Sequence, residues 1–361
     1  MGEGSKPSVR FKLIASVLSL VVFIFVSEGM LRLLDLDLYS KSKAFPLNRD
    51  IDFPEIYQKD ADLFWRFRPD FDTKSEQFSY LSYHINSTGM RGEEIADKGD
   101  AYRILALGNS CTFGWGIEYG STYCCQLQKL LSAKYPSKKI EVINAGVPGY
   151  SSHQGKIYFS NELLDLQPDM VLIMFGWNDQ WPAGKGICDD EQQMPSAFVL
   201  GLQNLASRTK LYQLARKVAV SLADRGEAPM LDDVSGMQRV SPECFCNNLK
   251  EIVKTAKAHD IKPVLLIPPV ACLENYFSGS ISDFHRRHAR YQAEIKRAAE
   301  YTFTEYIDLQ EPFDAYRDLF DDAQADPVHF NRQGHLVAAN AIAEKILPLL
   351  TSDSAAVFSH M

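Results

Sequence analysis

Short apolar runs alternate with stretches of helical periodicity from residue 102 onward, and most of the runs stop at a glycine or a polar turn. Such runs are typical of strands that are buried on both faces of a sheet. They predict five strands, at residues 104–107, 140–146, 169–176, 262–269 and 304–309. Because strands and helices alternate, we expect a three-layer α/β/α sandwich with a mostly parallel five-stranded sheet.

Two of the intervening helices carry start signals. Ser121 is placed to cap a helix with Leu127 and Leu131 on one face. Ser241 is placed to cap a helix over residues 242–259, whose first residue is a proline, as the first helical position favours.

The amino-terminal end combines positive charge with a long apolar run. Lys6, Arg10 and Lys12 precede an uncharged stretch, and residues 13–34 together reach the roughly 20 residues that a membrane span needs. We therefore expect one transmembrane signal-anchor at residues 13–34.

The charge distribution around this span predicts its orientation. Positive residues before a span favour a cytoplasmic location for residues 1–12, with the rest of the chain on the periplasmic or extracellular side. The alternative is a cleaved signal peptide and a secreted protein, because Ser27-Glu28-Gly29 resembles a cleavage site.

Residues 35–100 lead from this span into the predicted domain. Residues 50–72 are rich in aromatic residues, acids and prolines, and residues 64–69 alternate like an edge strand. We interpret residues 35–100 as a strap packed on the main domain, residues 101–350, and residues 351–361 as a disordered tail.

The interval 180–240 within this domain is too long for a plain connection. It contains an amphipathic stretch at residues 197–223 that includes Arg208, Lys210, Arg216 and Lys217. Two interpretations stay open: a lid or cap over the substrate side, or a helical excursion packed beside the sheet.

Composition excludes several classes of function. A formal net charge of −8 gives no basic surface for nucleic acid. The seven cysteines follow no zinc-ligand spacing, and no phosphate-cradling or cofactor motif is present, so we expect no cofactor and no metal. His285 and His288 have the spacing of a metal pair, but arginines flank them and no carboxylate ligand is evident, which favours a solvated helix face.

Polar residues stand at the ends of the predicted strands. Ser110 follows the first strand, Gly146 ends the second and Asn178 follows the third, while Asp326 and His329 share a loop near the carboxyl end. Acyl transfer by a serine needs a base beside the hydroxyl, a carboxylate that orients the base, and donors for the oxyanion. These residue types meet all three needs.

The blocks around these residues resemble the four marks of the SGNH hydrolases, the GDSL-type esterases and lipases. The marks are Gly108-Asn109-Ser110 with Thr112-Phe113-Gly114, Asn144-Ala145-Gly146, Gly176-Trp177-Asn178-Asp179, and Asp326-Pro327-Val328-His329. The resemblance covers about residues 102–350, and the chain looks like the membrane-anchored bacterial members with a long lead-in. It implies the flavodoxin-like variant of the sandwich.

By this resemblance Ser110 is the nucleophile, His329 the base and Asp326 its orienting acid. The backbone N–H groups of Ser110 and Gly146 and the amide of Asn178 would form the oxyanion hole. One position departs from the pattern, since Asn109 stands where the family usually has aspartate.

Two other residues near these blocks could compete for the same roles. His335 is a second candidate for the base, but we expect it to serve in packing or capping. Cys111 is expected to be a buried small residue rather than a second nucleophile. His329 must also reach Ser110 from the far end of the chain, which requires the fifth strand to leave the sheet near the first.

The resemblance implies a serine esterase that hydrolyses carboxylic esters of lipids or of O-acylated or O-acetylated glycans through an acyl-serine intermediate. The alternatives are an O-acyltransferase acting on cell-envelope polysaccharide and a non-catalytic envelope protein that retains the fold. The sequence does not choose the acyl group, the alcohol or the oligomeric state.

Overall fold

Five parallel strands form the central sheet of the computed structural model. They are β5 (Tyr102–Gly108), β6 (Ile140–Gly146), β7 (Met170–Met174), β8 (Lys262–Ile267) and β9 (Glu305–Asp308), and their order is β6-β5-β7-β8-β9. The expected five-stranded sheet is confirmed, and all four of its strand pairs are parallel. The structure describes residues 8–34, 56–72, 83–183, 186–223, 237–271, 280–316, 318–323 and 326–358.

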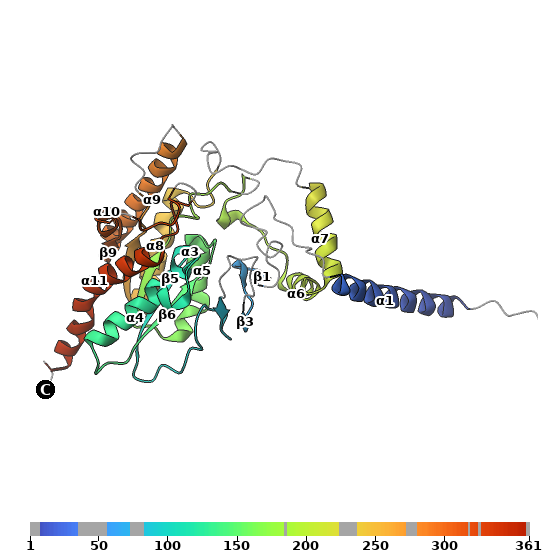
Figure 1. Cartoon of the computed structure of the whole chain (residues 1–361), viewed down its shortest axis with the longest axis horizontal. Helices are drawn as coiled ribbons and strands as arrows, with labels where there is room; N and C mark the ends of the chain where they lie inside the picture. Colours follow the sequence, from blue (N-terminus) through green and yellow to red (C-terminus); the bar gives the residue numbers. More distant parts are fainter. Residues whose placement is uncertain are drawn as a thin grey trace, which may run out of the picture.

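Helices cover both faces of this sheet. Ile104 and Ala106 belong to the core cluster on one side, and Leu105 and Leu107 to the cluster on the other, as the two-residue repeat of a strand requires. The first side is covered by α4 (Tyr123–Lys134) and α11 (Arg332–Phe358), and the second by α5 (Ser152–Asn161), α8 (Pro242–Ala258) and α9 (Ser280–Thr302) (Figure 1).

The starts and ends of these helices test the expected signals. Ser241 Oγ accepts a hydrogen bond from Cys244 N at the start of α8, as expected. Thr122, rather than Ser121, caps α4, because Ser121 is used in the short 3-10 helix Tyr119–Ser121. Helix α11 continues past the expected domain boundary at residue 350 to Phe358; residues 359–361 lie outside the described part.

The described parts of the lead-in form small antiparallel pairs apart from the main sheet. The strands β1 (Tyr57–Asp60) and β2 (Phe64–Phe67) make a hairpin, and β3 (Phe71–Asp72) pairs with β4 (His84–Ile85). Trp65 of the hairpin is buried in the core cluster that contains residues of α5, α8 and α9. Residues 35–55 and 73–82 lie outside the described residues.

The interval 180–240 is tied at both of its ends. Ala183 N donates to the Met237 carbonyl at 2.6 Å, and Arg239 N donates to the Trp181 carbonyl at 2.8 Å. The expected amphipathic stretch is divided into α6 (Ala197–Ala206) and α7 (Lys210–Ala223). Residues 184–185 and 224–236 are not among the described residues.

The apolar amino-terminal run is helical. Helix α1 (Val9–Leu33) is long and apolar enough to cross a membrane. No other helix in the described part of the chain meets this condition. It begins four residues before the expected boundary at residue 13, and it projects away from the sheet (Figure 1). A membrane anchor and a signal peptide both fit this helix.

Candidate active site

Strand β5 delivers Ser110 to the carboxyl-terminal edge of the sheet. Asn109 Oδ1 accepts from Cys111 N at 3.0 Å, so Asn109 caps the short helix α3 (Ser110–Phe113). Ser110 is its first residue, where the backbone N–H has no carbonyl partner within the helix. Asn109 retains the capping acceptor of an aspartate, while its Nδ2 is buried without a partner among the described residues.

Two glycines allow α3 to lie close against the strand ends. A Cβ added at Gly108 would lie 2.1 Å from Thr112 Oγ1, and one added at Gly146 would lie 2.2 Å from Phe113 N. Real side chains do not tolerate such contacts, so glycine at both positions is needed to seat the helix that carries Ser110.

The imidazole of His329 lies between the Ser110 hydroxyl and the Asp326 carboxylate. His329 Nε2 is 2.8 Å from Ser110 Oγ, and His329 Nδ1 is 2.7 Å from Asp326 Oδ2. Asp326 Oδ1 also accepts from the backbone N–H of His329 at 3.0 Å. Although partial burial acts to raise the pKa of Asp326, these hydrogen bonds and the nearby imidazole lower it below its ordinary value.

The loop that carries His329 is held on several sides. Ala271 N donates to the Pro327 carbonyl at 3.1 Å, and Cys111 Sγ lies 3.5 Å from the Val328 carbonyl. Asn331 N donates to the Leu319 carbonyl at 2.8 Å. Burial raises the pKa of the Cys111 thiol, so Cys111 stays protonated and packs against the loop, in keeping with the role expected for it.

The return path of this loop differs from expectation. In the sheet, β7 and β8 separate β9 from β5, so the fifth strand does not leave the sheet near the first. The chain instead crosses back after α10 (Gln310–Asp314), and α11 packs against α4 on the β5 side of the molecule.

The three predicted oxyanion donors are in different states. Asn178 is 6% exposed, and its Nδ2 donates one hydrogen to the Tyr150 carbonyl at 2.9 Å, which leaves the second amide hydrogen for another acceptor. The Ser110 N–H is in the first turn of α3, where it has no carbonyl partner within the helix. The Gly146 N–H, however, donates to Asn144 Oδ1 at 3.0 Å, so this predicted donor is already engaged.

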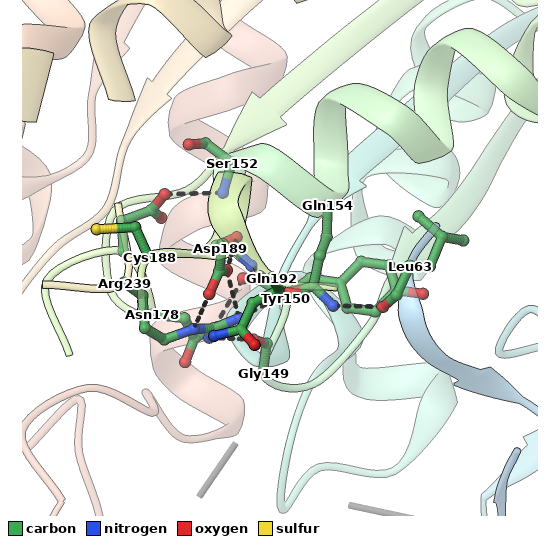
Figure 2. A network of polar contacts seen from close by, with 12 residues as sticks. Leu63, Gly149, Tyr150, Ser152, Gln154, Asn178, Cys188, Asp189, Gln192 and Arg239 are labelled. Carbon is green, nitrogen blue, oxygen red and sulfur yellow. Dashed lines mark hydrogen bonds and ion pairs between the residues drawn. The ribbon is translucent and has the colours of Figure 1, made fainter. Parts of the chain in front are cut away.

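A buried polar network fixes the loop that holds Asn178 (Figure 2). Arg239 Nη2 and Nε pair with the two oxygens of Asp189 at 2.7 and 3.0 Å, and Arg239 Nη1 donates to the Gly149 carbonyl at 2.7 Å. Ser151 Oγ donates to Asp189 Oδ2 at 2.6 Å. The ion pair thus connects the 180–240 interval to the turn that includes Tyr150.

Asp179 lies beside this network and completes the 176–179 block. It accepts from Ser152 N at 2.8 Å and from Gly176 N at 3.0 Å. Burial raises its pKa to about 6, against the lowering effect of its hydrogen bonds to Ser152. Its contacts are structural: the carboxylate joins the start of α5 to the end of β7.

Arg91 of the lead-in supports α3, a role that no sequence motif indicates. Its guanidinium donates to the Phe113 carbonyl at 2.6 Å, to the Gly114 carbonyl at 2.7 Å and to the Ile117 carbonyl. Burial lowers its pKa to about 10, so it is still charged at neutral pH. Arg91 belongs to no recognisable sequence motif, and only the fold reveals its hydrogen-bond partners.

His335, the second candidate for the base, and His288, of the pair with metal-ligand spacing, both have structural roles. His335 Nδ1 accepts from Tyr123 N at 3.0 Å, which satisfies a first-turn N–H of α4 rather than of its own helix. His288 is 1% exposed and stacks on Trp177 at a ring-centroid distance of 3.5 Å. The expected solvated face is therefore wrong for His288. Among the described residues no group of three or more His, Cys, Asp and Glu has the geometry of a metal site.

A pocket of about 400 Å³ is lined by Gly116, Ile117, Glu118, Asp321, Asn331, Arg332 and Gln333. One wall is Gly116–Glu118, which follows Trp115, and the Trp115 ring lies 6.3 Å from the His329 ring. Asn331–Gln333, which follow the His329 loop, also line this pocket.

Comparison with known proteins finds two acetylxylan esterases as relatives. The chain is 25% identical over 260 residues to an acetylxylan esterase of Geobacillus stearothermophilus, covering 71% of this chain and 94% of that one. It is 34% identical over 129 residues to an acetylxylan esterase of Xylanibacter ruminicola, which is 32% of this chain and only 25% of that longer protein.

Two solved structures are similar in outline. An α/β hydrolase from the metagenome of Lake Arreo has a TM-score of 0.44 and 22% identity, covering 68% of this chain and 96% of that one. A crystal structure of the Geobacillus stearothermophilus acetylxylan esterase has a TM-score of 0.44 and 20% identity, covering 70% and 96%. Residues 106–337 match the sequence profile of the GDSL-like lipase/acylhydrolase family, more than half of the chain, and the chain therefore belongs to this family of ester-bond hydrolases.

Proposed function

We propose that the chain hydrolyses carboxylic esters through an acyl-serine intermediate, with Ser110 as nucleophile, His329 as base and Asp326 as the group that orients the base. The observation that carries this proposal is the continuous line of contacts from Asp326 through His329 to Ser110 Oγ, at 2.7 and 2.8 Å. Such a line is what activation of a serine hydroxyl requires.

The first half of the reaction forms the acyl-enzyme. Ser110 Oγ attacks the ester carbonyl carbon while His329 Nε2 accepts the hydroxyl proton. The tetrahedral intermediate then collapses, and His329 returns the proton to the leaving alcohol oxygen. In the second half, water attacks the acyl-serine by the same proton transfers and releases the carboxylic acid and free Ser110.

Two donors support the oxyanion in both halves. In this proposal the Ser110 N–H at the start of α3 and the second amide hydrogen of Asn178 stabilise the charge on the carbonyl oxygen. The Gly146 N–H joins them only if it leaves Asn144 Oδ1, with which it is bonded in this structure. The primary contribution of Gly146 is then the space that it leaves for α3.

For the substrate we propose an O-acetylated glycan. Besides Gly116 and Ile117, the pocket that follows the His329 loop is lined by Glu118, Asp321, Asn331, Arg332 and Gln333, and these five side chains suit the hydroxyls of a sugar better than an acyl chain. Both curated relatives are acetylxylan esterases, which supports the same class.

For the location we propose that α1 is retained as an anchor, with the hydrolase domain on the periplasmic or extracellular side. The basic residues Lys6, Arg10 and Lys12 before the apolar run support this orientation. Glu28 accepts hydrogen bonds from the N–H groups of Lys210 and Leu211 at 3.0 and 2.9 Å, so cleavage after Gly29 would remove a partner that the folded domain uses.

The substrate proposal is tested with p-nitrophenyl esters of increasing acyl length and with acetylated xylan oligosaccharides. We expect acetate to be released from both acetyl substrates and activity to fall with longer acyl chains. Arg332→Ala should raise KM for the oligosaccharide while leaving p-nitrophenyl acetate unaffected. Preference for long acyl chains, with no acetate released from glycan, would contradict the substrate class while leaving the triad assignment intact.

A further inference from the structure

The helices α6 and α7 expose large apolar side chains. On α6, Phe198, Leu202 and Leu205 are 75%, 53% and 66% exposed, and their spacing of four and three places them on one face. On α7, Val218 and Leu222 are 49% and 61% exposed and are also four residues apart. Rows of this kind on a protein surface mark a site of contact with another apolar surface.

The opposite face of α6 is attached to the protein. Leu200 is buried, and the Asn204 amide both accepts from Lys59 N and donates to the Lys59 carbonyl, each at 2.8 Å. The buried Arg68 donates to Ser207 Oγ at 2.9 Å. One face of α6 therefore binds the β1–β2 hairpin, and the opposite face is exposed.

The junction between α6 and α7 is bound by the carboxyl end of α1. Glu28 caps the first turn of α7 through Lys210 N and Leu211 N, pairs with Arg32 at 2.7 Å, and Arg32 donates to the Arg208 carbonyl at 3.1 Å. Helix α7 begins at this end of α1 and runs across its direction (Figure 1). The two helices thus lie where α1 would leave a bilayer.

The charge of this segment suits a lipid surface. Residues 197–223 contain four Lys or Arg and no Asp or Glu, in a chain whose net charge is −8. Helices that combine Lys or Arg with exposed Phe and Leu bind in the headgroup region, and anionic lipids strengthen the attachment.

We propose that α6 and α7 lie on the bilayer surface, with Phe198, Leu202 and Leu222 inserted at the boundary of headgroups and acyl chains. This second membrane contact rests on the proposed anchor α1. Because α6 is bonded to β1, and Phe67 of β2 stacks on Phe113 of α3 at 5.3 Å, the contact fixes the orientation of the active site relative to the membrane.

The test uses the full chain in vesicles of phosphatidylcholine and phosphatidylglycerol with brominated acyl chains, which quench tryptophan at membrane depth. Phe198→Trp adds a fluorophore to the proposed contact. Phe303→Trp is the matched control, because Phe303 is 93% exposed in the turn between α9 and β9. We expect the added emission to be quenched in Phe198→Trp and unquenched in Phe303→Trp, with both variants retaining activity on p-nitrophenyl acetate.

Three results would overturn the proposal, and each has a distinct meaning. If carbonate extraction releases the chain from membranes, the anchor itself fails and the second contact with it. If the chain resists extraction but Phe198→Trp is as unquenched as the control, only the second contact fails. Cross-linking of two copies through α6, without lipid quenching, would show that a second copy covers this face.

Discussion

His329 Nε2 lies 2.8 Å from Ser110 Oγ, although the two residues are 219 positions apart in the chain. The packing of α11 against α4 brings them together, not a neighbouring pair of strands. The contact joins the start of α3, which Asn109 caps, to the loop of His329, where Asp326 Oδ1 accepts from the His329 N–H.

If these residues act as one unit, their losses are not additive. We expect Ser110→Ala and His329→Ala each to abolish measurable kcat above the background reaction, and the double variant to be no worse than either single variant. Asp326→Ala should be milder, because Asp326 orients the base and does not transfer the proton in our mechanism. Full activity in His329→Ala together with loss in His335→Ala would reverse the assignment of the base.

Asn178 provides a test of the oxyanion donors. Loss of one such donor typically lowers kcat on the order of a hundredfold or more, because the developing charge loses a preorganised hydrogen bond. We expect that effect for Asn178→Ala, with little change in KM. Asn340→Ala is the control, since Asn340 is an exposed asparagine whose amide donates to the Leu336 carbonyl of its own helix. An unchanged kcat in Asn178→Ala would remove this residue from the site.

The buried Arg239–Asp189 pair allows a double-mutant cycle. Arg239→Met leaves the buried Asp189 carboxylate without its cation, which typically destabilises a fold by about 3–5 kcal/mol. Replacing both, as Arg239→Met with Asp189→Leu, should be less destabilising than the sum of the single changes. Urea unfolding measures the cycle. Additive losses would show that the pair is not coupled in the way its distances indicate.

Two buried imidazoles predict sensitivity to acid. Burial lowers the pKa of His335 and of His288 from 6.5 to about 3, so the folded chain keeps both neutral while the unfolded chain protonates them below pH 6.5. Stability should therefore fall as pH decreases from about 6.5 toward 3, by roughly 1.4 kcal/mol per pH unit for each histidine.

The variant His335→Asn isolates one of these contributions, because asparagine can still accept from Tyr123 N. We expect its loss of unfolding free energy between pH 7 and pH 5 to be about 2 kcal/mol smaller than that of the wild type. Exposed His259→Asn serves as the control. Equal pH slopes in His335→Asn and the wild type would contradict a neutral buried His335.

Much of the sheet could be predicted from the sequence because its strands carry strong local signals. Residues 140–146 form β6 with the expected bounds, since an apolar run that ends in glycine has few other conformations available in an α/β protein. The cap of α4 moved by one residue to Thr122, because either Ser or Thr satisfies the first turn and the preceding 3-10 helix decides between them.

The supporting contacts of the site could not be predicted, because they depend on tertiary distances between segments without motifs. Nothing in the sequence around Arg91 indicates that its guanidinium binds three carbonyls next to Ser110. The sequence also does not indicate that Asn144 Oδ1 accepts from the Gly146 N–H. This hydrogen bond changes the expected set of oxyanion donors.

Covalent labelling by a fluorophosphonate tests the central claim most directly, since the reagent modifies a serine only where a base activates it. We predict that mass spectrometry of the full chain finds a single labelled peptide, with the modification on Ser110, and that labelling is lost in Ser110→Ala and His329→Ala. Labelling of another residue, or ester hydrolysis that persists in Ser110→Ala, would contradict the account.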